Sequence, residues 1–211
     1  MKPDIIAVDP KTIDYPIFTK QVEKYREYFN KVIIISTAEL RGGDWRDVAT
    51  NKGLFESTSD WVLFLEQDFF FTKFFLLAVR AEVKNYDAIG FWEANRLHPA
   101  FLLVKREWIE KTSKDFDPIY EEKLDHFGRF SKELVQEGAK IGELEKDLGL
   151  KLREDFYHMQ GLTHNHNLYR DKNFAPIFKR HEFQTYCKYA GIDVNELGEF
   201  EEVEWLKKFL V

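Results

Sequence analysis

Cysteine, methionine and proline are scarce in this 211-residue chain, which has one, two and six of them. The single cysteine, Cys187, excludes a disulfide framework and a cysteine-based zinc site. No apolar stretch is long enough to span a membrane. The opening residues Met1–Asp4 lead into a short apolar segment, which lacks the long apolar core of a secretory signal. We therefore expect a cytoplasmic protein with no transmembrane segment.

The chain also lacks an excess of positive charge. It has 31 basic and 37 acidic side chains, for a net charge of −6. This balance argues against a nucleic-acid partner, although a local group of cations at a phosphate stays possible. Hydrophobic residues make up 44% and charged residues 32%, an ordinary globular composition. The length, with no linker or repeat in sight, predicts a single domain over residues 1–211.

Aromatic side chains are abundant, at 16% of the chain with 20 phenylalanines. Most of them must fill the core. A surplus of this kind often lines a pocket that stacks on rings.

Three short apolar runs predict parallel strands over residues 5–8, 32–35 and 61–65. Residues with helical spacing separate them, so the order is β-α-β-α-β, and right-handed crossovers make the three strands parallel. We expect all three strands to be buried on both faces, including Ile34. The fold class predicted is α/β, with three layers around a central mixed sheet.

The rest of the chain alternates between helical and extended patterns. We expect strands at 88–92 and 100–104, with His98 and Pro99 between them. We expect mostly loop over 155–180. The other expected elements are helices over 45–55, 73–84, 124–137, 181–190 and 193–210 and a short strand over 140–144.

Two acidic residues follow the third apolar run. Glu66 and Asp68 stand two residues apart, and alternate residues of an extended chain share a side. In an open α/β sheet, ligands bind beyond the carboxyl ends of the strands. Two hard oxygen donors there suit Mg²⁺ or Mn²⁺, whose shell substrate phosphates complete. Alternatively, Asp68 caps the following helix and Glu66 is simply exposed.

Several motifs together resemble the GT-A glycosyltransferases, especially their family-2-like group. The resemblance covers most of residues 4–170. It departs from the family in one respect, because the first acid of the Asp-x-Asp motif is Glu66. The segments that carry it are Gly43-Asp44-Trp45-Arg46, Asn51-Lys52-Gly53, the stretch from Ser59 to Asp68, the stretch from His98 to Arg106, and Asp125-His126-Phe127.

This resemblance implies a nucleotide-diphospho-sugar transferase fold and a nucleotide-sugar donor, with a UDP-sugar favoured. The acceptor would be a hydroxyl of a glycan, a lipid-linked molecule or another compound, and the transfer would be inverting. Asp68 would hold the divalent ion, and Glu66 would contact the ribose or, through water, the ion. Asp9 and Ser36, which end the first two strands, would lie near the base and ribose.

Two cations precede the acidic motif and are candidates for the diphosphate. Arg46 and Lys52 lie on the helix before the third strand. The alternative is that they belong to a solvated helix face.

Asp125 is the candidate catalytic base, because the resemblance places an acid at the start of a late helix. An inverting transfer needs a carboxylate to take the proton of the acceptor hydroxyl. The alternative role is a helix N-cap. The neighbouring His126 is a second candidate for the same task.

The loop after Gly161 offers further metal ligands. His164 and His166 are alternate residues that can reach one ion, and in GT-A families a late histidine completes the metal shell. We favour these two over His158. Arg170 and Lys172 would neutralise the leaving diphosphate. The alternative is an exposed polar loop.

Other functions remain open. A nucleotidyltransferase would carry a glycine-rich loop after the first strand, where this chain has Asp9-Pro10-Lys11. A catalytically idle module that binds a nucleotide-sugar is a second alternative, since Glu66 replaces the usual Asp. A His-x-His metallohydrolase leaves the stretch 61–68 without explanation.

Overall fold

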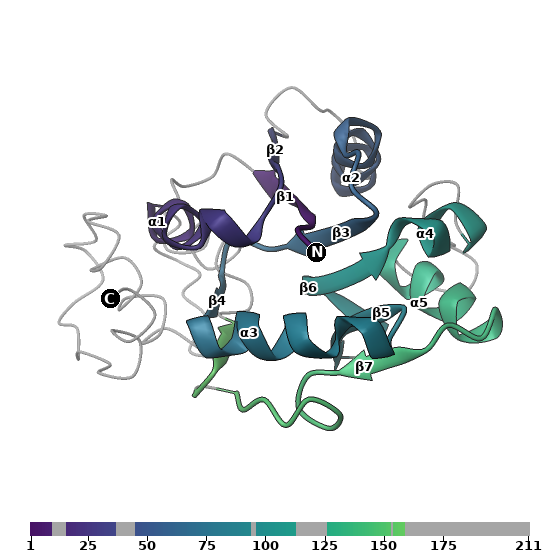
Figure 1. The fold of residues 1–211 in the computed structure, drawn as a ribbon. Coiled ribbons are helices and arrows are strands. Elements are labelled where there is room, and N and C mark those ends of the chain that lie inside the picture. Colours follow the sequence, from purple (N-terminus) through teal and green to yellow (C-terminus); the bar gives the residue numbers. More distant parts are fainter. Residues whose placement is uncertain (10–15, 37–44, 94–95, 113–125, 153, 159–211) are drawn as a thin grey trace, which may run out of the picture.

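A six-stranded mixed sheet forms the centre of the computed structural model (Figure 1). The strand order is β2-β1-β3-β6-β5-β7. The described residues are 1–9, 16–36, 45–93, 96–112, 126–152 and 154–158. The helices expected over 181–190 and 193–210 lie outside them.

The first three strands are parallel, as the sequence predicts. β1 (Asp4–Asp9) lies between β2 (Val32–Ser36) and β3 (Trp61–Leu65). The fourth strand in the sheet order, β6 (Arg96–Lys105), runs antiparallel to both of its neighbours, β3 and β5 (Ala88–Glu93). β3 is therefore an interior strand. The last strand, β7, spans Ile141–Glu143 and is parallel to β5.

Helices cover both faces of this sheet, so the predicted three layers are confirmed. Alternate strand residues point to opposite faces. Leu63 and Leu65 face the core cluster that includes residues of α1 and α3, whereas Val62 and Phe64 face the cluster that includes residues of α2, α4 and α5. The helices are α1 (Pro16–Lys24), α2 (Trp45–Glu56), α3 (Lys73–Glu82), α4 (Arg106–Thr112) and α5 (His126–Gln136).

The helix ends follow ordinary capping chemistry. Pro16 begins α1, and the Thr72 hydroxyl accepts a hydrogen bond from Phe75 N at the start of α3 (3.3 Å). Gly138 ends the α5 region with a φ of +80°, which a glycine adopts without strain. None of the helices in the described part of the chain combines the length and apolar composition that crossing a membrane requires.

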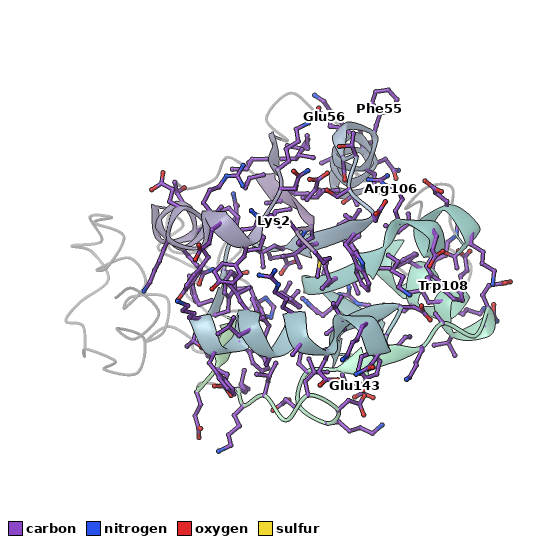
Figure 2. The ribbon with its side chains drawn as sticks, viewed as in Figure 1. Lys2, Phe55, Glu56, Arg106, Trp108 and Glu143 are labelled. Carbon is purple, nitrogen blue, oxygen red and sulfur yellow. The ribbon has the colours of Figure 1, made fainter. Side chains whose placement is uncertain are left out.

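Not every apolar residue of the predicted elements is buried. Ile34 is 49% exposed because β2 is an edge strand, so the expectation of burial on both faces is wrong there. Phe55 is 91% exposed and projects from the end of α2, away from the sheet (Figure 2).

His98 and Pro99 lie inside β6 and do not separate two strands. The pairing of β5 with β6 shifts between Gly90 and Trp92, whose partners are Leu102 and Leu97. The extra residues of β6 form a bulge, where a proline costs no ladder hydrogen bond. The strand expected over 100–104 is therefore shorter than β6, which already begins at Arg96.

A small second sheet lies beside the main one. β4 (Phe69–Phe71) pairs antiparallel with β8 (Phe156–His158). β8 lies in the segment 155–180, which was expected to be mostly loop. On α1, the buried Gln21 amide donates to Phe69 O (3.0 Å) and accepts from Phe71 N (2.8 Å). The backbone of β4 is thus hydrogen-bonded by β8 and by a side chain, which holds this short strand in place.

A buried carboxylate anchors the amino end of β1. The exposed fraction of Asp4 is 0%, and its oxygens accept hydrogen bonds from Thr58 N (2.8 Å), Ser59 N (3.0 Å) and Asn30 Nδ2 (2.8 Å). The hydroxyls of Ser57 and Ser59 donate as well, each at 2.9 Å. Burial raises the pKa of Asp4, but these hydrogen bonds outweigh it and lower the pKa to about 2.

We predict that Asp4→Asn lowers the free energy of unfolding by about 2–3 kcal/mol at pH 7, because hydrogen bonds to a charged acceptor are lost. The ordinary pKa is 3.8 and the folded-state pKa is about 2. The ionised Asp4 carboxylate therefore contributes its full share of the free energy of unfolding above pH 3.8, and this share is lost as the pH falls through about 2. Urea unfolding at several pH values measures it. The exposed Asp60→Asn serves as control, and equal stabilities of the two variants would contradict the prediction.

Candidate metal site at the carboxyl edge of the sheet

The ends of β1, β2 and β3 meet at one edge of the sheet, as the sequence predicts. Asp9 and Ser36 are register partners in the parallel pairing of β1 with β2. β3 runs parallel beside β1 and ends just before Glu66. The backbone therefore brings these three positions to the edge where α/β proteins bind their ligands.

A tight turn follows β3, so the chain is not extended at the acidic pair. Glu66 N donates to Ala100 O (3.1 Å), and Phe69 N donates back to Glu66 O (3.2 Å). Asp68 does not cap the following helix, since Thr72 holds that place. The turn nevertheless brings both carboxylates to one side chain, that of His158.

His158 joins the two acids. Its Nε2 lies 3.2 Å from Glu66 Oε2 and 3.5 Å from Asp68 Oδ1. The side chains of His158, Asp68 and Glu66 are 6%, 11% and 33% exposed. The pairing of Phe69 with His158 between β4 and β8 positions the imidazole.

The charge on the two acids controls the protonation of His158. Burial lowers the pKa of the imidazole, but the charges of Asp68 and Glu66 and their hydrogen bonds raise the pKa to about 10. Without a metal ion, one imidazolium therefore lies between the two carboxylates at neutral pH.

A second imidazole reaches the cluster from the bulge in β6. The His98 ring stacks on Phe91 with ring centres 5.1 Å apart and lies 4.8 Å from the His158 ring centre. Its Nδ1 accepts a hydrogen bond from Ala100 N (3.1 Å). Potential ligand atoms of Glu66, His98 and His158 all lie within 4.8 Å of one another.

The donor set fits a divalent ion. Two ligand atoms at right angles and about 2.1–2.2 Å from one ion lie about 3 Å apart, close to the separation of His158 Nε2 and Glu66 Oε2. His158 Nδ1 is buried and has no hydrogen-bond partner among the described residues. A buried nitrogen without a partner costs free energy, so the cluster is incomplete as it stands. The group Glu66, His98 and His158 could hold a metal ion.

Phenylalanines surround this cluster on the side of α3. Phe69 has ring contacts with Phe75, Phe91, Phe101 and Phe156 at 5.4–6.1 Å. Many of the aromatic residues thus fill the core beneath the cluster.

The remaining predicted site residues are only partly described. Lys52 is exposed on α2, and its place at a diphosphate stays a prediction. The side chains of Asp9, Ser36 and Arg46 are not described. Asp125, His164, His166, Arg170 and Lys172 lie outside the described residues.

Two residues of the cluster escaped the sequence reading. His158 was the less favoured histidine, because its strand of three residues is too short to give a pattern. His98 was taken as a separator, because Pro99 hides the continuing strand. The apolar pair Phe156-Tyr157 directly before His158 was the one available signal.

Comparisons with known proteins give structural likenesses at low sequence identity. No family model and no curated relative matches the chain. The structure is similar to A197 from STIV at 16% identity (TM-score 0.48), covering 68% of this chain and 82% of that one. It is also similar to TarS 1–349 of S. aureus at 15% identity (TM-score 0.47), over 90% and 72%. A protein described as a nucleotide-diphospho-sugar transferase from Desulfovibrio desulfuricans G20 has 12% identity (TM-score 0.41), over 93% and 99%. At these identities and scores, the likenesses say nothing about the reaction of this chain.

We predict that His158 stays protonated well above pH 7 in protein stripped of divalent ions. The raised pKa, about 10, stabilises the fold below the ordinary value of 6.5, and this stabilisation is lost as the pH rises through about 10. Imidazole ¹⁵N NMR of the stripped protein, recorded over a range of pH, measures the pKa of His158. In Asp68→Asn the pKa of His158 falls, because the carboxylate charge that raises it most is removed. Titration of His158 near pH 6.5 in the unsubstituted protein would contradict the prediction.

Proposed function

We propose that this chain is a glycosyltransferase that uses a nucleotide-diphosphate sugar, with a UDP-sugar favoured, and a divalent ion. The observation that carries the proposal is the convergence of Glu66, Asp68 and His158 at the carboxyl end of an interior strand. That edge is where α/β folds bind nucleotides, and clustered carboxylates with an imidazole are ligands for a divalent ion.

The residues of the cluster have distinct tasks in this proposal. Asp68 and Glu66 supply the hard oxygen donors, and His158 supplies nitrogen from β8. A bound Mn²⁺ or Mg²⁺ would neutralise the charge on the two phosphates of the donor. Glu66 would contact the ribose or, through water, the ion.

The transfer step needs a base. In the inverting reaction, the acceptor oxygen forms a bond to the anomeric carbon, the bond from that carbon to the phosphate oxygen breaks, and the nucleoside diphosphate leaves. We assign the hydroxyl proton to the Asp125 carboxylate. Asp125 directly precedes α5 in the sequence, and Ser131 in the middle of that helix accepts a hydrogen bond from Leu97 N (2.8 Å), next to His98 in β6.

The cations expected at the donor stay part of the proposal. Arg46 lies in the first turn of α2, the helix that follows β2. This amino-terminal end of α2 is the end next in the chain after the carboxyl end of β2. Lys52 is six residues further along, about 9 Å at 1.5 Å per residue. Arg46 is therefore the better placed of the two for a diphosphate at the carboxyl edge. Arg170 would neutralise the leaving group, and His164 or His166 would add a ligand.

A catalytically idle nucleotide-sugar-binding module is the alternative, because Glu66 stands where the related enzymes carry Asp. Such a module would bind the donor with the same metal dependence and would neither transfer nor hydrolyse the sugar. Turnover therefore separates the two.

We predict that Asp68→Asn abolishes Mn²⁺-dependent binding of UDP and UDP-sugars. The substitution preserves volume and a hydrogen-bonding oxygen but removes the charge that an ion requires. Calorimetry with and without Mn²⁺ measures binding. Asp60→Asn is the matched control, since it makes the same change at the other end of β3. Equal affinity of Asp68→Asn and the unsubstituted chain for the nucleotide would refute the metal role.

Asp125→Asn should retain donor binding and lose turnover by a factor of about 10² or more, the usual contribution of a positioned base. Donor affinity by calorimetry and sugar release by chromatography give the two readouts. Unchanged turnover would exclude Asp125 as the base. A loss of donor affinity would show that it acts in binding instead.

A further inference from the structure

Helix α3 is apolar on both of its sides. Phe75, Leu76 and Val79 are buried in the core. Phe74 and Leu77 lie on the opposite side of the helix and are 63% and 46% exposed. In Figure 1, α3 lies at the surface of the molecule, in front of the sheet. A helix that is apolar all round is normally covered on every side, so the outer side of α3 indicates a contact that the described part of the chain leaves open.

Three cations accompany the two exposed apolar side chains. Lys73 and Arg80 are exposed on α3, and Lys84 is exposed in η2 (Val83–Asn85), the short helix directly after it. Helical spacing places the three along one flank of Phe74 and Leu77. None of the three cations is in an ion pair within the part of the chain that the structure describes. These five residues, Lys73, Phe74, Leu77, Arg80 and Lys84, are called the α3 face below.

Helix stability does not explain this charge distribution. Lys73 is the first residue of α3, where the helix macrodipole disfavours a cation, and no acid in the first turn compensates it. Glu82 is the one acid of the segment 73–85, and its carboxylate accepts a hydrogen bond from Asn85 Nδ2 (2.7 Å). Since the whole chain has a net charge of −6, the cations of the α3 face run against its overall balance.

An apolar cavity lies beside the α3 face. Leu76, Val79 and Arg80 line it from α3, and Met1 and Tyr28 are among the other lining residues. The cavity has about 360 Å³ of empty space, and Arg80 is its one charged lining residue. An aliphatic chain suits such a lining, and a guanidinium suits an anionic group at the end of that chain. The combination is that of a site for an amphiphile with a negative headgroup.

We propose that the α3 face binds the surface of a bilayer that contains anionic lipids. Phe74 and Leu77 enter the boundary between headgroups and acyl chains, and the cations contact the lipid phosphates. The cavity beside Arg80 takes the end of an acyl chain. A second copy of the chain fits less well, because a two-fold contact would bring the same cations together. The proposal uses no residue of the metal cluster and does not depend on the reaction.

Two pairs of matched variants separate the apolar and the charged contributions. Phe74→Ser is compared with Phe55→Ser, since Phe55 is also exposed, at 91%. Lys73→Glu is compared with Lys111→Glu, since the Lys111 side chain is 50% exposed. The two control positions belong to α2 and α4, which cover the other face of the sheet. Lys73→Glu should not weaken the fold, because a carboxylate suits the amino end of a helix. Urea unfolding checks that all four variants are folded.

The experiment is co-sedimentation of the full chain with vesicles. One kind contains equal parts of phosphatidylglycerol and phosphatidylcholine, and the other contains phosphatidylcholine alone. The chain should bind the anionic vesicles and bind the neutral ones more weakly, and added salt should lower the affinity by screening. Phe74→Ser and Lys73→Glu should each bind the anionic vesicles about fivefold or more weakly, whereas both controls should bind as the unsubstituted chain does.

Equal binding to both kinds of vesicle, or binding to neither, would contradict the proposal. So would Phe74→Ser and Lys73→Glu variants that bind the anionic vesicles as tightly as their controls. Sedimentation velocity at several protein concentrations tests the other occupant. Dimers that Phe74→Ser abolishes would make the α3 face a contact between two copies, and the proposal would then be wrong. None of these results bears on the metal cluster, so the proposed function stands or fails by its own experiments.

Discussion

The contact of one buried imidazole with two carboxylates is the interaction on which this site depends. Glu66 and His158 are 92 residues apart in the chain, and their side chains meet at 3.2 Å. Two acids at the edge of a partly buried cluster repel each other, and a cation between them is required. In the protein alone the protonated His158 is that cation. A bound divalent ion would provide more charge at the same place.

The fold around this contact explains why it is held so closely. β4 and β8 are three residues each, too short to be stable alone, yet Gln21 hydrogen-bonds the backbone of β4 and a layer of phenylalanines packs beneath both strands. On the other side, the bulge in β6 brings His98 up against the same ring. At the opposite end of β1, the hydrogen bonds of Asp4 fix the strand whose carboxyl end forms part of the edge.

The sequence predicted the fold well where its signals were long and regular. The apolar runs of β1 to β3 and the end of the helix expected over 124–137 were read correctly, since both are local patterns with a physical cause. Ile34 was misjudged because a run of apolar residues does not distinguish an edge strand from an interior one. The acidic pair was found from its position after a buried strand, although a turn and not an extended chain brings the two acids together. His98 and His158 were missed as partners, because their proximity comes from a bulge and from a pairing over long sequence separation, which no local pattern carries.

The central claim is that Glu66, Asp68 and His158 hold the ion that binds a nucleotide-diphosphate. Diffraction from crystals soaked with Mn²⁺ and UDP, recorded at the manganese absorption edge, tests it most directly. We expect one anomalous peak within bonding distance of Asp68 or Glu66 and of a His158 nitrogen, with both phosphates on the opposite side of the ion. A peak elsewhere, or nucleotide bound away from this edge of the sheet, would contradict it.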